Sequence, residues 1–114
     1  MMTLKVHKPL LQYLQTAKPL VARAITRTID DDQIQMIGMI CANLLSGAIK
    51  VAPVSRSALS QHAEIIRKIG KKQIKVKTRR TLIYKHIDIV LQVIKASFNK
   101  LYPKNNGSST ASSS

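Results

Sequence analysis

The sequence predicts an all-α fold, a compact bundle of four to five short helices with a longer C-terminal amphipathic helix. Apolar residues recur at three- and four-residue spacing, prolines stand where helices could begin, and no segment reads convincingly as a strand. Apolar residues make up 45% of the 114 positions and aromatic residues only 4%, so the core is expected to be aliphatic. A chain of this length is about one domain.

The first two helices are expected to begin at prolines. Proline is best tolerated in a first helical turn, because the N–H group that it lacks has no helical partner there. A short helix should therefore run from Pro9 through Leu14, and a second should begin at Pro19 and present apolar residues as far as Ile25. Residues 1–8 would then be an N-terminal extension.

The third helix has the clearest predicted boundaries. Asp30 is the expected N-cap, since two further aspartates follow it and Gln33 stands at the spacing of a capping box. Ser46 and Gly47 supply a stop signal. The apolar residues between these boundaries predict a central core helix: Ile34, Met36, Ile37, Ile40, Cys41, Leu44 and Leu45.

Two more helices are expected in the second half of the chain. Pro53 should open a fourth helix that ends at Gly70, and after a lysine-rich connector the last helix should run from about Thr78 to Leu101. Residues 103–114 are expected to be a disordered Ser-rich tail, which leaves residues 9–102 as the helical domain. The last helix carries a broad apolar stripe: Ile83, Ile87, Val90, Leu91, Ile94, Phe98 and Leu101.

Positive charge is concentrated in the second half of the sequence. Nineteen Lys and Arg residues against five Asp and Glu give a formal net charge of +14. Residues 1–47 hold five basic and three acidic side chains, whereas residues 48–104 hold fourteen basic and two acidic ones. A positive field of this size attracts polyanions, so nucleic acid and anionic lipid head groups are the candidate partners.

The segment from residue 67 to residue 80 reads RKIGKKQIKVKTRR and contains no acidic residue. Basic residues near the C-terminus of a helix complement its dipole, but this explains only two or three of the charges. No polar array suggests a recognition helix and no aromatic residues are interleaved, so we expect sequence-independent binding to phosphates, with duplex DNA as the partner. The predicted binding residues are Arg67, Lys68, Lys71, Lys72, Lys75, Lys77, Arg79 and Arg80.

Enzymatic chemistry has little support in the sequence. The three histidines lie far apart, Cys41 has no second cysteine, and the four glycines form no phosphate-binding loop. We therefore expect no catalytic residue, no metal site and no cofactor. No secretion signal and no conventional transmembrane helix is expected either, because charges interrupt every long apolar run.

An alternative function would use the last helix as a membrane-interface or protein-interaction module. Charged residues make this helix too polar to span a bilayer but compatible with lying at its surface. A broad stripe on a small helical protein is more often core or an oligomer contact, so a membrane surface is the less favoured partner. A homo-oligomer would use Ile83, Ile87, Val90, Ile94 and Phe98.

Short motifs follow one another in a fixed order from residue 9 to about residue 83. They combine early prolines, an Ile-rich helix that ends in Asn-Leu-x-x-Gly, and a proline-initiated helix followed by basic clusters. The residues concerned are Pro9, Leu10, Leu11, Pro19, Arg23, Asp32, Ile34, Ile37, Ile40, Cys41, Ala42, Asn43, Leu44, Gly47, Pro53, Leu59, His62, Ile66, Arg67, Lys68, Ile69, Lys71, Lys72, Lys77, Arg79, Arg80 and Leu82.

This ordered set resembles the small basic proteins of Maverick/Polinton-type mobile elements and adintovirus-like DNA viruses. In that family the basic run is followed by a Gly-rich apolar part that is similar to adenovirus core protein X, whereas here an amphipathic helix follows it. The resemblance implies a viral or mobile-element protein that condenses or packages DNA, located in the nucleus or the virion. It implies no catalytic residues.

Overall fold

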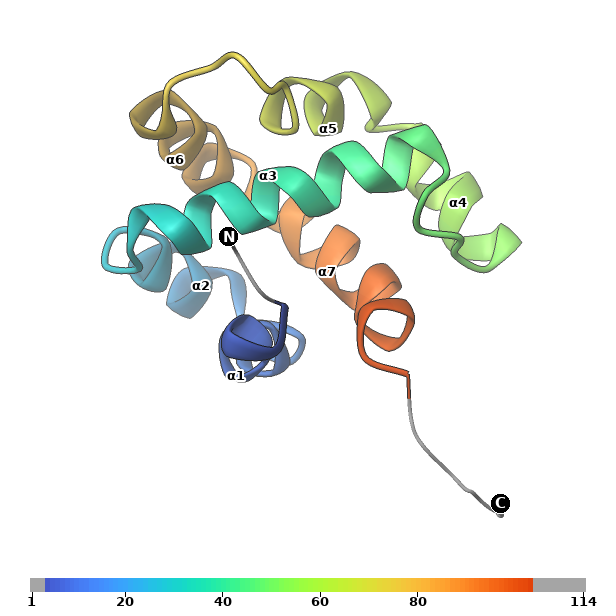
Figure 1. The fold of residues 1–114 in the computed structure, drawn as a ribbon, viewed down its shortest axis with the longest axis horizontal. Coiled ribbons are helices and arrows are strands. Elements are labelled where there is room, and N and C mark those ends of the chain that lie inside the picture. Colours follow the sequence, from blue (N-terminus) through green and yellow to red (C-terminus); the bar gives the residue numbers. More distant parts are fainter. Residues whose placement is uncertain (1–3, 104–114) are drawn as a thin grey trace.

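The computed structural model describes residues 4–103, and this part of the chain is all-helical, as predicted (Figure 1). The expected Ser-rich tail lies, apart from Pro103, outside the described residues. The described helices are α1 (Leu4–Leu14), α2 (Pro19–Thr26), α3 (Asp31–Ser46), α4 (Pro53–Ser60), α5 (Ala63–Ile69), α6 (Val76–Lys85) and α7 (Ile87–Leu101).

Helix α7 lies at the centre of the bundle. It contacts α1, α2, α3, α4 and α6, while α3 crosses it and also contacts α5 and α6 (Figure 1). The fully buried side chains between these helices are almost all aliphatic, as the composition predicts. The largest of them are Leu11, Ile34, Met36, Ile37, Ile40, Ile66, Ile69, Ile83, Ile87, Val90, Val93 and Ile94.

Several helix boundaries agree with the sequence prediction. The backbone N–H of Gln33 donates to Asp30 Oδ1 at 2.9 Å, and the Asp30 N–H donates to Gln33 Oε1 at 3.1 Å, which completes a capping box at the start of α3. Gly47 ends α3 with a φ of 85°, a left-handed conformation that glycine adopts without strain. Pro19 and Pro53 open α2 and α4.

The predicted start of the first helix is wrong. Helix α1 begins at Leu4 and has Pro9 in its interior, so it extends into the segment expected to be an N-terminal extension. His7, Leu11 and Leu14 are buried on one side of α1, which packs against α7. This packing maintains the helix across the proline, because burial of one face outweighs local helix propensity.

Two predicted helices are each divided in the structure. Between Pro53 and Gly70 the chain turns at residues 61–62, because α4 packs on α7 whereas α5 packs on α3. The expected helix from Thr78 starts earlier, at Val76, and is interrupted at His86, where φ is −114° and ψ is 39°. The last helix, α7, therefore has 15 residues and is shorter than expected, and α3 with 16 residues is longer.

The apolar stripe of the last predicted helix is used inside the chain. Ile83, Ile87, Val90, Ile94 and Phe98 are all buried in the core. An oligomer or membrane contact through these side chains would require the core to open, so we do not carry that alternative forward. No helix among residues 4–103 combines the length and apolar character needed to cross a membrane.

Candidate nucleic-acid interface

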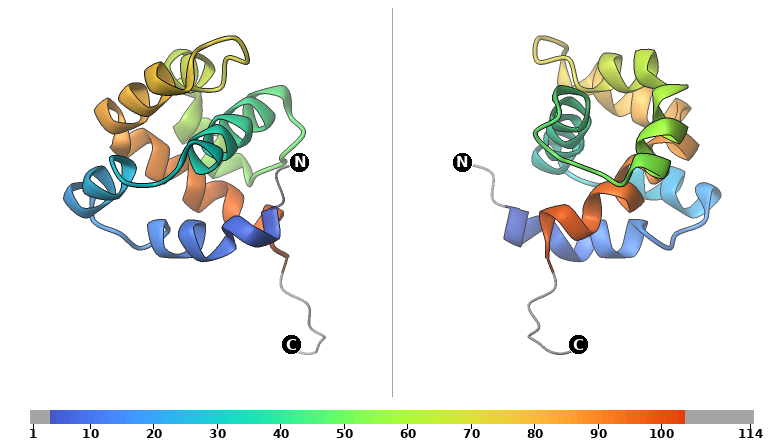
Figure 2. Two further views of the ribbon diagram at one scale, coloured as in Figure 1. Left: turned by 60° about the vertical axis from the view of Figure 1, so that its left-hand side comes forward. Right: turned by 90° about the vertical axis from the view of Figure 1, so that its right-hand side faces the viewer.

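The basic segment forms the end of α5, the loop at residues 70–75 and the start of α6. This loop lies on the opposite side of the molecule from α1 (Figures 1 and 2). Of the eight predicted binding residues, six have exposed side chains: Arg67, Lys68, Lys71, Lys72, Lys75 and Lys77. Of the other two, Arg79 is buried and Arg80 is half-buried, and both are bonded to other parts of the protein.

Arg79 is buried, with only 5% of its surface exposed. Its Nε donates to the carbonyl oxygen of Ile69 at 2.8 Å, and its Nη2 donates to that of Lys71. These two carbonyls end α5 and begin the loop, so the guanidinium stabilises the negative end of the helix dipole and fixes the loop to α6. Burial lowers the pKa of Arg79, and the neighbouring Cys41 opposes that shift.

Arg80 is also engaged with internal partners. Its Nη1 donates to the carbonyl oxygens of Thr26 at 2.9 Å and Ile29 at 2.5 Å, and its Nη2 lies 2.9 Å from Asp31 Oδ1. Arg80 therefore joins α6 to the turn between α2 and α3. We remove Arg79 and Arg80 from the candidate site, because their hydrogen-bonding groups are directed at the protein itself.

Close backbone packing holds the other side of the loop. Gly70 is buried against α3, and a Cβ atom at this position would lie 2.7 Å from the backbone nitrogen of Ala42. Ile69 is fully buried and Val76 packs against the core. The loop that carries the exposed lysines is therefore anchored at both ends.

Three of the six exposed side chains line a common groove. Arg67, Lys68 and Lys71 lie along a hollow of about 720 Å³ between α3 and α5, whose floor includes Ala42 and Leu45. Glu64 is the acidic residue that lines this groove. Among the described side chains the one ion pair joins Arg80 to Asp31, so the six exposed cations have no carboxylate partner there.

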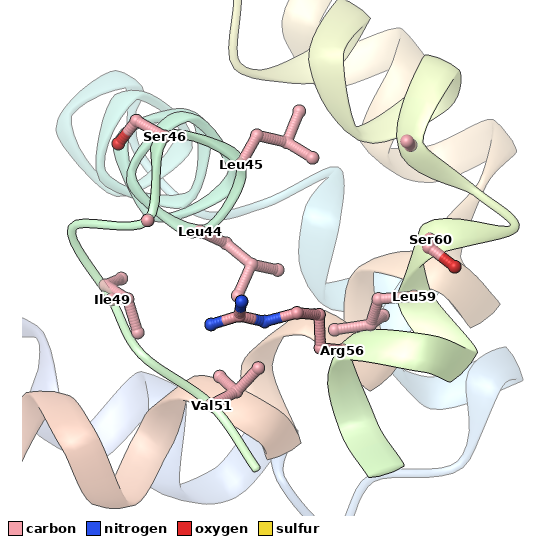
Figure 3. A pocket seen from close by; sticks show the side chains of 10 residues that line it. Leu44, Leu45, Ser46, Ile49, Val51, Arg56, Leu59 and Ser60 are labelled. Atoms are coloured by element: carbon pink, nitrogen blue, oxygen red, sulfur yellow. The ribbon is translucent and has the colours of Figure 1, made fainter. Parts of the chain in front are cut away.

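A separate hollow of about 230 Å³ lies between the end of α3 and α4 (Figure 3). Leu44, Ile49, Val51 and Leu59 line it, and the Arg56 side chain extends from α4 across it. Arginine commonly covers apolar surface with its aliphatic stem and keeps its charge near water. Arg56 is the one charged residue in this lining, and we assign the hollow no function.

Cys41 is buried in α3 beside Arg79. Burial raises the pKa of its thiol to about 12, and the positive charge of Arg79 opposes the shift. A buried thiol with a raised pKa stays protonated at neutral pH and is a poor nucleophile. Cys41 is therefore a packing residue in this structure.

Sequence reasoning missed a second group of cations near α6. Arg23 and Arg27 of the α2 region approach the ring of Tyr84, although they precede it by 61 and 57 positions. Neither arginine belongs to the continuous basic run, and no local pattern connects them to Tyr84. Only the packing of α2 on α6 brings them together.

No protein-family model, curated protein or solved structure matches this chain.

Proposed function

We propose that this protein binds nucleic acid without reading its sequence, through phosphate contacts of the α5–α6 face. This face is defined as Arg67, Lys68, Lys71, Lys72, Lys75 and Lys77. The observation that carries the proposal is that these six side chains are exposed, close in sequence and without carboxylate partners among the described residues. Cations in such an arrangement are available for phosphate oxygens.

The fixed loop supports the same proposal. Binding is weakened when a mobile segment must become ordered, so a preformed surface retains more of its contact energy. Here the hydrogen bonds of Arg79 and the packing of Gly70 hold the backbone at the start of the loop in the absence of a ligand. The face offers five lysines as compact point charges, which suits a phosphate backbone more than base edges.

A duplex is the form of nucleic acid that this face suits best. No Tyr, Phe or Trp belongs to the α5–α6 face, so it has no aromatic ring on which an unpaired base could stack. Counterion release by six phosphate contacts would give a slope of about −5 for log K against log salt concentration. This slope is the quantity to measure.

The test compares two variants that remove the same number of charges. Lys68→Gln/Lys71→Gln/Lys72→Gln lies on the α5–α6 face, and the control Lys50→Gln/Arg56→Gln/Lys95→Gln changes exposed residues on and near α4 and α7. Binding to fluorescent duplex DNA is measured by anisotropy from about 50 to 200 mM salt. The face variant should lower the slope to about −3, while the control keeps it near −5.

Two results would overturn the proposal. Absence of duplex binding by the unchanged protein at about 50 mM salt would contradict it, since phosphate contacts are strongest there. Equal weakening by the face variant and the control would show that net charge alone attracts DNA. Circular dichroism of each variant verifies that helix content is retained.

We extend the proposal to DNA condensation or packaging, the role that the resemblance to mobile-element and viral proteins implies. A protein of net charge +14 can neutralise many phosphates on one DNA molecule. Sedimentation of plasmid DNA at increasing protein concentration measures compaction directly. Failure to compact DNA despite duplex binding would limit the function to binding.

A further inference from the structure

Two arginines and one tyrosine form a compact cluster where α2 packs on α6. We call Arg23, Arg27 and Tyr84 the α2–α6 cluster. The Cζ atom of Arg23 lies 6.0 Å from the centroid of the Tyr84 ring, and that of Arg27 lies 5.6 Å from it. Arg23 Nε also donates to the carbonyl oxygen of Tyr84 at 3.3 Å, which joins this arginine to the C-terminal end of α6.

Neither arginine of the cluster is neutralised by an acid among the described residues. The nearby Arg80 differs, because it is paired with Asp31 and bonded to two carbonyls. Two guanidinium groups directed at one ring repel each other, and cation–π attraction to tyrosine offsets only part of this repulsion. An anion placed beside them would therefore be bound favourably.

The cluster borders a hollow that can receive such an anion. Arg27, Arg80, Thr81 and Tyr84 line a space of about 370 Å³. Tyr84 lines this hollow and is 36% exposed, so part of the residue is accessible to a ligand. A ligand in the hollow would meet guanidinium donors and an aromatic surface together.

A phosphate attached to an unpaired base matches both features. Unpaired bases stack on tyrosine rings and on guanidinium planes, while arginine donors bind the adjoining phosphate. Duplex DNA offers the phosphate but keeps its bases stacked inside the helix. The α5–α6 face has no ring, so the two surfaces suit different forms of nucleic acid.

We propose that the α2–α6 cluster binds single-stranded nucleic acid, with one base on Tyr84 and its phosphate at Arg27. The proposal shares with the proposed function the premise that the protein binds nucleic acid, but it depends on different side chains. Strands of DNA and RNA carry the same combination of base and phosphate. Oligo(dT) and oligo(U) therefore serve as separate arms of the test.

The decisive variant is Tyr84→Leu, which removes the ring and keeps an apolar side chain. Loss of one stacked base should weaken binding of oligo(dT) or oligo(U) about tenfold. Binding of duplex DNA should be unchanged. Tyr84→Phe keeps the ring and should bind single strands close to normally. Arg27→Gln should weaken single-strand binding and also reduce the slope of log K against log salt concentration.

Tyr13→Leu is the matched control. Tyr13 is 54% exposed on α1, and no cation of the described residues lies over its ring. This variant should bind single strands normally. The protein contains three tyrosines and no tryptophan, so quenching of tyrosine fluorescence by oligo(dT) gives a second readout that Tyr84→Leu should diminish.

The outcomes separate this proposal from the proposed function. Unchanged single-strand binding by Tyr84→Leu, or equal loss for single strands and duplex, would overturn the role of the cluster. Neither result would alter the comparison of lysine variants on duplex DNA. Loss of thermal stability in Tyr84→Leu together with normal binding by Arg27→Gln would instead make the cluster a structural contact, which also overturns the proposal.

Discussion

Gly38 and Arg79 form a closely fitted pair between α3 and α6. A Cβ atom on Gly38 would lie 2.6 Å from Arg79 Nε and 2.7 Å from its Cδ. A long side chain can often move away from such a contact, but Arg79 is held by the carbonyl oxygens of Ile69 and Lys71. The absence of a side chain at residue 38 therefore allows Arg79 to reach the end of α5.

Gly38→Ala should destabilise the protein despite the higher helix propensity of alanine. Overpacking of a filled site lowers the free energy of unfolding by about 1–3 kcal/mol, whereas the propensity gain is about 1 kcal/mol. In an Arg79→Ala background the contact is gone, so Gly38→Ala should be neutral or stabilising. Urea denaturation of the four proteins in this double-mutant cycle measures the coupling, and equal effects in both backgrounds would contradict the packing argument.

Sequence reasoning located the candidate site, but it could not distinguish the exposed cations from the two arginines that are bonded within the protein. Arg79 and Arg80 belong to the same basic run as the exposed cations, and their structural roles depend on carbonyl groups of α5 and of the turn before α3. Such partners are absent from any local pattern. Arg23 and Arg27 were missed for the same reason, because they meet Tyr84 only through the packing of α2 on α6.

At the scale of single helices, local signals determined what could be predicted. The capping box at Asp30, the stop at Gly47 and the starts at Pro19 and Pro53 depend on side chains within a few residues of each boundary. The break at His86 has no such signal, because the apolar spacing from Ile83 to Val90 continues through it. The helix is interrupted there because α6 and α7 pack against different sets of helices.

Asp30→Ala should lower the free energy of unfolding by about 1 kcal/mol, since it removes the acceptor for the Gln33 N–H at the start of α3. Asp30→Asn is the matched control, because asparagine caps helices about as well as aspartate. Thermal and urea denaturation of both variants give the comparison. A similar loss for both would mean that charge, rather than the capping hydrogen bond, makes the contribution of Asp30.

At the scale of the whole molecule, charge repulsion acts over distances similar to the size of the protein. The described part measures 43 × 29 × 28 Å, and the Debye length is about 30 Å at 10 mM salt and about 8 Å at 150 mM. At low salt, cations on opposite sides of the molecule therefore repel each other. At physiological salt only neighbouring charges do.

Salt should affect folding and DNA binding in opposite directions. Raising sodium chloride from about 10 to 150 mM screens the repulsion and should increase Tm by about 4 °C or more, equivalent to about 1 kcal/mol. The same change weakens duplex binding. Differential scanning calorimetry measures the change in Tm. The variant Lys68→Gln/Lys71→Gln/Lys72→Gln should show a smaller increase in Tm, because it carries fewer positive charges. A fall in Tm with salt would mean that attraction between charges dominates.

The fold class was predictable because it depends on composition and periodicity along the entire chain. An aliphatic, helix-periodic sequence with proline boundaries has few alternatives to a helical bundle. The arrangement of the helices was not predictable, since it depends on which apolar faces meet. Pro9 shows this dependence, because it lies inside a helix that packs against α7, which no local signal predicts.

The central position of α7 also affects how the chain is made. Ribosomes synthesise proteins from the N-terminus, so the helix that α1, α2, α3, α4 and α6 pack against emerges after all of them. Until Ile87–Leu101 has left the ribosome, the earlier helices lack the apolar surface that they share. The cationic segment is thus translated before the protein can fold around α7, and close to the ribosomal RNA.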